Sequence, residues 1–488
     1  MSELQIKLTE NNVDENNPWS DDALNSIATA QKLTAILTPQ KNALTVSLNG
    51  EWGSGKTFLL KRWQCDLKNN DYTAIYFNAW EDDFLSDPFI AIIGQLWKEL
   101  KKDSFKEVCE AVKTAAIPFL KRVGISMLNS RINKITGVDL LEIVDNELKT
   151  ASESAFDNYV KLTDCRDDLK KRLQELADKI FSEKQKPLIF IVDELDRCRP
   201  TFAIEVLERI KHLFNIRYII FVLGIDRKQL GKSIQAVYGN IDVENYLHRF
   251  IDIDFAIPEP DHKKFFDALW DSYELTQYLK IYGYKDSGVD EGDVFKDICY
   301  DIMAWHGFSL REIEQTLKLY IILLHGINTH QPMWPHLAIV LILLKLRNQD
   351  LYRQYINHKC YVADVVNYVV PENCIQNDNF HYKQMIYSIY ASFIPTYISS
   401  DHYNKIIDLM QKMENKEPLS SSSYCARCFL NKDPEWCATF AKDFQLMIKN
   451  PRPERYSLET FGRVISLIDL LSVGTTKNTK TPSSSVMA

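Results

Sequence analysis

Short apolar runs alternate with helix-like segments through the first half of the chain. The runs are rich in β-branched and aromatic residues and end in turn or polar residues, which predicts strands at 44–48, 72–77, 188–192, 218–223 and 250–255. Between them, apolar residues recur at helical spacing, for example after residue 56 and from 87 to 100. Helices that alternate with strands favour a mostly parallel sheet with helices on both faces, the α/β three-layer class.

The same pattern divides the 488 residues into several parts. Prolines 258 and 260 end the fifth run, because proline cannot continue a strand ladder. The polar, helix-patterned stretch at 101–186 is too long for an ordinary crossover, which indicates an insertion. Helical spacing of aromatic and aliphatic residues continues after residue 260. We therefore expect an α/β core (1–100 and 187–260), a helical insertion (101–186), a helical lid (261–330), a helical C-terminal domain (331–474) and a disordered tail (475–488).

Composition excludes several classes of protein. A formal net charge of -8 argues against a general surface for nucleic-acid backbones, although a local basic patch could still bind one. The basic stretch at 101–134 could lie on an anionic membrane, but we favour a helix packed on its own domain. The ten cysteines occur without a secretion signal, which indicates reduced thiols. The longest apolar runs, such as 337–344, fall far short of the roughly 20 residues of a membrane span, so that run is expected to be a core helix. We expect a cytoplasmic protein without a transmembrane segment.

A phosphate-binding motif follows the first predicted strand. Gly50–Thr57 fits G-x-x-x-x-G-K-[ST] in the required strand-to-helix context. Its backbone N–H groups are expected to face nucleotide phosphates, with Lys56 reaching the β- and γ-phosphates and the Thr57 hydroxyl on Mg²⁺. The core is thus predicted to be a P-loop NTPase sandwich that binds ATP and Mg²⁺. The predicted nucleotide-binding residues here are Gly50, Trp52, Gly53, Ser54, Gly55, Lys56, Thr57 and Phe58.

An apolar run that ends in acids supplies the second half of this site. A P-loop needs a carboxylate on a neighbouring strand to hold the metal, and Asp193 follows the run at 188–192. Glu194 is then placed to polarise the attacking water as a general base. Asp196 is a further catalytic candidate, and for Asp196 and Arg197 a structural ion pair is the alternative.

Four segments of this sequence resemble the KAP family of P-loop NTPases. They are the phosphate loop, Tyr76-Phe77-Asn78-Ala79-Trp80, Asp193-Glu194-Leu195-Asp196-Arg197-Cys198 and Leu223-Gly224-Ile225-Asp226-Arg227. The likeness spans roughly residues 20–330 and explains the insertion, which contains transmembrane helices in membrane-bound members but not here. It implies an ATPase that acts as a conformational switch or assembly factor in bacterial antiphage defence, in a homo-oligomer and beside a partner protein.

The resemblance also suggests roles for residues outside the two main motifs. Asn78 and Trp80 are expected to end a central strand near the phosphates, with a site role for Asn78 and packing of Trp80 against a helix. Asp226 ends the strand beside the acidic one, where related ATPases place a sensor of the γ-phosphate. A helix N-cap is the alternative for Asp226.

Two arginines are catalytic candidates on the same basis. Arg249 precedes the last strand, where similar ATPases offer an arginine to a neighbour's nucleotide. Arg311 opens a helix of the predicted lid and resembles a sensor arginine. An ordinary surface or helix-pairing role is the alternative for both.

The sequence leaves three other hypotheses open, one about a metal site and two about function. Cys425, Cys428 and Cys437 could suggest zinc, but a fourth ligand at normal spacing is missing. A nucleotide-gated scaffold with little hydrolysis, or an ATP-dependent protein that acts on nucleic acid, would use the same phosphate loop.

Overall fold

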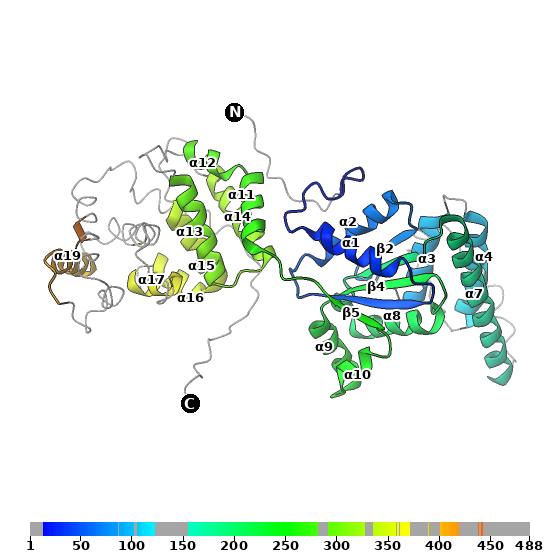
Figure 1. Cartoon of the computed structure of the whole chain (residues 1–488). Coiled ribbons are helices and arrows are strands. Elements are labelled where there is room, and N and C mark those ends of the chain that lie inside the picture. Colours follow the sequence, from blue (N-terminus) through cyan, green and yellow to red (C-terminus); the bar gives the residue numbers. More distant parts are fainter. Residues whose placement is uncertain are drawn as a thin grey trace. The chain divides into compact units, whose positions relative to one another are not determined.

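The computed structural model describes residues 13–85, 87–101, 105–122, 155–281, 291–326, 335–357, 359–360, 362–370, 401–418 and four single positions (389, 438, 441 and 442). The chain forms two compact units, with the boundary between Pro260 and Asp261 (Figure 1).

The first unit is built on a five-stranded sheet. Its strands are β1 (Leu44–Asn49), β2 (Ala74–Asn78), β3 (Leu188–Asp193), β4 (Ile219–Ile225) and β5 (Ile253–Ala256). They lie in the order β2-β3-β4-β1-β5, and every neighbouring pair is parallel. All residues of β3 and β4 are buried, which explains their uninterrupted apolar sequences. The predicted α/β class is confirmed.

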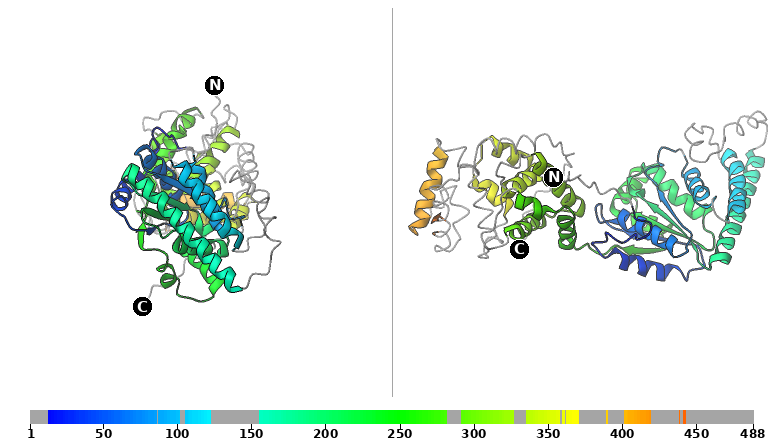
Figure 2. Two further views of the ribbon diagram at one scale, coloured as in Figure 1. Left: turned by 90° about the vertical axis from the view of Figure 1, so that its right-hand side faces the viewer. Right: turned by 90° about the horizontal axis from the view of Figure 1, so that it is seen from above.

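Helices cover both faces of this sheet (Figure 2). Ile189 and Ile191 of β3 point into a cluster with the helices α1 (Ser26–Leu37) and α2 (Lys56–Asn69). Phe190 and Val192 alternate with them and pack on the opposite face. The helices on that opposite side include α3 (Pro88–Leu100), α8 (Pro200–Leu213), α9 (Arg227–Tyr238) and the short α10 (Val243–Leu247).

The described part of the insertion is helical and packs on the same core. The helices α4 (Lys106–Arg122) and α7 (Ala155–Lys184) contact each other. Phe119 of α4 and Leu173 of α7 are buried in the cluster that contains Phe190. In 105–122 the expected packed helix is therefore present. No helix in the described ranges is long and apolar enough to cross a membrane.

Two expectations about strand position are wrong. The acidic strand β3 is not the neighbour of β1, because β4 lies between them. Strand β2, which was expected to be central, lies at an edge of the sheet. Parallel neighbours are joined by crossovers, so a strand that comes later in the chain can insert between two earlier ones. Sequence order alone therefore does not give spatial order.

The second unit is helical in its described residues and has one apolar core. The segment Leu337–Leu344 of α15 is buried throughout, as expected for a core helix. Cys425, Cys428, Cys437 and the predicted tail at 475–488 lie outside the described residues. The helices are α11 (His262–Ser272), α12 (Leu275–Ile281), α13 (Glu291–Trp305), α14 (Leu310–Gly326), α15 (Pro335–Arg347), α16 (Gln349–Ile356), α17 (Val362–Val369) and α19 (Asp401–Glu414).

Candidate functional site

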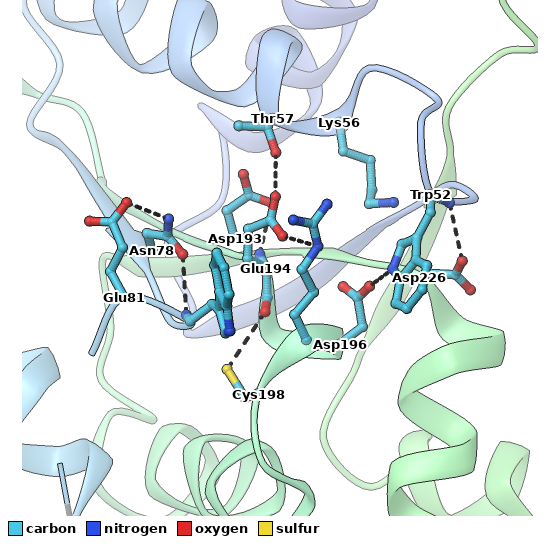
Figure 3. A network of polar contacts seen from close by, with 12 residues as sticks. Trp52, Lys56, Thr57, Asn78, Glu81, Asp193, Glu194, Asp196, Cys198 and Asp226 are labelled. Atoms are coloured by element: carbon cyan, nitrogen blue, oxygen red, sulfur yellow. Dashed lines mark hydrogen bonds and ion pairs between the residues drawn. The ribbon is translucent and has the colours of Figure 1, made fainter. Parts of the chain in front are cut away.

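The phosphate loop connects β1 to α2 at the carboxyl edge of the sheet (Figure 3). Gly53 and Gly55 have φ angles of 86° and 87°, which side chains with a Cβ rarely adopt. A Cβ on Gly50 would lie 2.6 Å from the Ser54 hydroxyl oxygen. These glycines let the loop curl so that α2 begins at Lys56 with its N-terminus facing the loop.

Lys56 is folded back over the loop in this structure. Its ammonium donates to the carbonyl oxygens of Gly50 (2.5 Å) and Glu51 (3.1 Å). Burial lowers the pKa of Lys56, and four nearby carboxylates oppose that shift. The Ser54 hydroxyl is buried and has no hydrogen-bond partner among the described residues. An unpartnered donor beside a lysine is what an anion such as phosphate would satisfy.

Phe58 takes a different place from the rest of the predicted set. Its ring lies under the guanidinium of Arg62, with 3.4 Å between the guanidinium carbon and the ring centroid. The side chain of Phe58 is therefore occupied by packing on α2, and only its backbone remains as a contact for phosphate.

Asp193 ends β3 and is almost fully buried. Its Oδ1 accepts the amide of Glu194 (2.9 Å), and its Oδ2 accepts the hydroxyl of Tyr76 on β2 (2.8 Å). Burial raises the pKa of Asp193, and hydrogen bonds from the hydroxyls of Thr57 and Tyr76 and from the Glu194 amide counteract part of that effect. On the other side, Asp193 pairs with Gly224 of β4, where a Cβ would lie 2.9 Å from Oδ1.

Glu194 is engaged at both carboxylate oxygens. Its Oε1 accepts the hydroxyl of Thr57 (3.1 Å), and its Oε2 forms an ion pair with Arg197. Its φ of 62° is left-handed and turns the chain out of the strand. Burial raises the pKa of Glu194, whereas the guanidinium of Arg197 lowers it. The candidate base and the candidate magnesium ligand thus hold each other across the edge of the sheet.

Asp196 and Asp226 both hold the exposed Trp52 of the phosphate loop. The Trp52 indole N–H donates to Asp196, and the Trp52 amide donates to Asp226 Oδ2 (3.2 Å). Asp226 Oδ1 also accepts the amides of Lys228 and Gln229 (3.0 and 3.2 Å), so the helix N-cap considered for Asp226 is present. Arg197 pairs with Glu194 rather than with Asp196.

Asn78 and Trp80 differ from their expectation. Asn78 organises its own turn: its Oδ1 accepts the Trp80 amide (3.1 Å) and its amide group donates to Glu81 (2.7 Å). Trp80 is 54% exposed, so the expected packing against a helix is wrong. Trp80 lies two residues beyond the end of β2, in the turn that Asn78 holds.

Arg249 does not lie at the phosphate loop of its own unit, and Arg311 belongs to the other unit. Arg249 is exposed in the turn between α10 and β5. Because β5 runs parallel to β1, Arg249 precedes the amino end of β5 while the loop follows the carboxyl end of β1. Arg311 is exposed at the second residue of α14, beside the cap that Ser309 and Glu312 form, and belongs to the helical unit.

Sequence reasoning missed two residues at this site. Tyr76 and Gly224 contact the Asp193 carboxylate from the strands on either side. Gly224 stood within a quoted motif, but only the register of β3 against β4 shows what it faces. Tyr76 also opened one of these motifs, but its hydrogen bond to Asp193 depends on β2 being adjacent to β3, which the sequence does not show.

The residues present suit a hydrated magnesium ion. Thr57, Asp193 and Glu194 offer hydroxyl and carboxylate oxygens, which are the donors Mg²⁺ prefers. Mg²⁺ commonly takes one or two such ligands together with substrate phosphates, so the small number of protein donors is appropriate.

The parallel sheet, the phosphate loop and the acidic strand end define a P-loop NTPase. The model of the family described as "KAP family P-loop domain" matches residues 27–415, and the chain belongs to this family.

A curated relative, the "Phage T7 exclusion protein" of Escherichia coli (strain K12), is 24% identical over 347 residues. That match covers 65% of this chain and 43% of the relative, so it spans less than half of the relative's length. The solved structure titled "Structure of the Aeropyrum Pernix ORC2 protein (ADPNP-ADP complexes)" covers 87% of this chain and 94% of its own, at 11% identity. Its TM-score of 0.24 is too low to support any argument.

Proposed function

We propose that the chain binds ATP with Mg²⁺ and hydrolyses it, and that the cycle drives a conformational switch or assembly step. The observation that carries this proposal is the contact between the two motifs. The Thr57 hydroxyl, at the start of α2, lies 3.1 Å from Glu194 Oε1, beyond the end of β3. Residues 137 positions apart thus meet where a metal-bound γ-phosphate and its attacking water would need them.

Each residue has a defined task in this proposal. The loop amides, Ser54 and Lys56 bind and orient the phosphates. Bound Mg²⁺ would neutralise charge that develops on the phosphate oxygens. Asp193 and Thr57 would hold the metal, and Glu194 would accept the proton of the attacking water. Each Glu194 oxygen already has one partner, Thr57 or Arg197, and keeps a lone pair that could accept this proton.

The Glu194 engagement also supports the alternative, a nucleotide-gated scaffold. A base that stays paired with Thr57 and Arg197 would let ATP bind without hydrolysis. Glu194→Gln separates the two hypotheses, with Glu205→Gln as a control at another half-buried glutamate whose pKa burial raises. An ATPase predicts that Glu194→Gln binds ATP but releases phosphate roughly 10²–10⁴-fold more slowly. Full activity of Glu194→Gln in cells would instead favour the scaffold.

We also propose that Arg249 acts on the nucleotide of a second copy. Arg249 forms no ion pair with the described residues, and its own phosphate loop lies at the opposite edge of the sheet. Exposed large apolar side chains occur in the elements around it and at the nucleotide edge, which suits a head-to-tail interface. Those side chains are Val237 and Tyr238 at the end of α9 and Ile253 at the start of β5, together with Trp52 in the phosphate loop and Trp80 and Phe84 after the carboxyl end of β2.

A complementation experiment tests this trans role. Lys56→Ala lacks a working loop but keeps Arg249, whereas Arg249→Ala keeps the loop. A mixture of the two variants should hydrolyse ATP faster than either alone, because one copy supplies the site and the other the arginine. His248→Ala, at the exposed neighbour, is the control. A mixture no faster than its components would contradict the trans role.

The biological role proposed is antiphage defence beside a partner protein. It is supported by family membership and by the relative named for exclusion of phage T7. The test of this role is protection from phage in cells that carry Lys56→Ala. Protection should be lost, and unchanged protection would contradict the role.

Arg311 is proposed as a sensor arginine, so Arg311→Ala should reduce hydrolysis more than ATP binding.

A further inference from the structure

We propose that Tyr76 is a positioning residue for magnesium, because its hydroxyl holds the Asp193 carboxylate in the orientation that a metal ligand needs. Tyr76 belongs neither to the phosphate loop nor to the acidic strand end. The inference rests on the proposed binding of Mg²⁺ with nucleotide, and it adds a residue that acts on the metal through Asp193.

The contacts of Asp193 show how its carboxylate is fixed. Tyr76 donates to Oδ2 at 2.8 Å and the Glu194 amide donates to Oδ1 at 2.9 Å. An ionised carboxylate has about four lone-pair sites, so both oxygens keep acceptor capacity for a metal or its bound water. Asp193 is 1% exposed, so bulk water cannot take over the task of orienting it.

Gly224 closes the remaining side. It pairs with Asp193 in the register of β3 and β4, and a Cβ there would lie 2.9 Å from Oδ1. The carboxylate is therefore held between a hydroxyl from β2 and the bare backbone of β4. Hydrogen-bond partners of this kind orient metal ligands and typically contribute 10–100-fold to metal affinity.

The ring and the backbone of Tyr76 make contacts that do not involve its hydroxyl. Its ring packs against the cluster of α1 and α2, with the Lys61 ammonium 5.6 Å from the ring centroid. Its carbonyl oxygen accepts the side-chain amide of Gln95 on α3 (2.9 Å). The aromatic ring and backbone would stay anchored if the hydroxyl alone were removed.

Tyr76→Phe deletes only that hydroxyl. Tyr72→Phe is the matched control, because the Tyr72 hydroxyl bonds Thr38 (2.8 Å) and not Asp193. The measurement is binding of a fluorescent, non-hydrolysable ATP analogue to the full chain, first in EDTA and then over a Mg²⁺ titration. We expect Tyr76→Phe to raise the half-saturating Mg²⁺ concentration roughly tenfold or more, with affinity in EDTA unchanged. Tyr72→Phe should match the wild type in both conditions.

Each other result contradicts the inference in a distinguishable way. If wild type and Tyr76→Phe respond to Mg²⁺ alike, Tyr76 has no positioning role and the proposed function stands. If Tyr76→Phe also loses affinity in EDTA, the hydroxyl supports the fold of the site rather than the metal. If wild type and Tyr72→Phe show no magnesium-dependent binding, both the inference and the proposed function are wrong.

Discussion

The two units differ in what they bury. Of the nine buried polar or charged side chains in the described part of the chain, eight lie before Pro260 and one, Thr316, lies in the helical unit. Three of the eight are the carboxylates Asp193, Asp196 and Asp226 at the carboxyl edge of the sheet. The core of the helical unit is otherwise built from aliphatic, aromatic and sulfur-containing side chains, including tyrosines such as Tyr273 and Tyr320 whose hydroxyls are buried, and it holds no buried carboxylate in its described residues.

This difference locates the chemistry. Burying a carboxylate costs free energy unless hydrogen bonds or opposite charges compensate it. The sheet unit supplies that compensation with Tyr76, Trp52 and Lys56. The helical unit shows no comparable arrangement in its described residues, so its core is explained by packing alone. Four substitutions test this contrast, from the largest expected effect to the smallest.

Lys56→Ala should have the largest effect. It removes the cation at the loop and leaves the carboxylates around it without compensation, so both ATP binding and hydrolysis should fall. We expect a loss of roughly 10²–10³-fold in phosphate release. Lys68→Ala, on the same helix but paired with Glu99 (2.7 Å), should retain activity. Normal turnover by Lys56→Ala would show that hydrolysis does not depend on the phosphate loop.

Asp193→Asn should weaken the response to magnesium. The variant keeps the side-chain size but loses the negative charge, and its NH₂ group cannot accept a hydrogen bond, so one of the two existing acceptor positions is lost. We expect on the order of a hundredfold higher Mg²⁺ requirement for phosphate release. The check is a Mg²⁺ titration of the rate, and an unchanged half-saturating concentration would show that the metal lies elsewhere.

Gly224→Ala should destabilise the sheet unit. Its Cβ would meet the Leu60 side chain and the Asp193 carboxylate, and overpacking of this kind costs about 1–3 kcal/mol. Gly231→Ala is the comparison, because its Cβ would meet only the Val243 side chain, at 3.0 Å from the nearest methyl, and alanine favours the helix α9. Unfolding in urea should distinguish them, and equal stabilities would show that β4 can move away from Asp193.

His306→Asn tests the helical unit and should have the smallest effect. Burial lowers the pKa of His306 below 6.5, with Arg347 acting in the same direction. The unfolded chain therefore binds the proton first, and stability should fall as pH drops below about 6.5. His306→Asn should remove this loss, on the order of 1 kcal/mol or less. Calorimetry from pH 8 to 5 is the measurement, with exposed His248→Asn as the control. An unchanged pH slope in His306→Asn would contradict the prediction.

Much of the sheet unit could be predicted because its local signals agree. The strands at 44–48 and 188–192 fall within a residue of β1 and β3, since each run is buried and ends at a glycine loop or an acid. The fifth strand begins three residues later than expected. Phe250 and Ile251 precede this strand, and they are apolar because they pack into the cluster on the sheet face covered by α3 and α8.

The parts that could not be predicted depend on long-range placement. The insertion of β4 between β1 and β3, and the edge position of β2, follow from crossovers that leave no local mark. The contacts of Tyr76 and Gly224 with Asp193 need the register of three strands. Asp226 is a further example, because its side chain caps α9 and also accepts the Trp52 amide of the phosphate loop, and only the first role was predicted.

The central claim is that this edge of the sheet hydrolyses ATP. The most direct test is phosphate release from ATP by the purified chain, with and without Mg²⁺, over a series of protein concentrations. Hydrolysis at this site by an oligomer predicts magnesium-dependent turnover that rises per protomer with concentration and is lost in Glu194→Gln. Tight ATP binding without turnover at any concentration would contradict it.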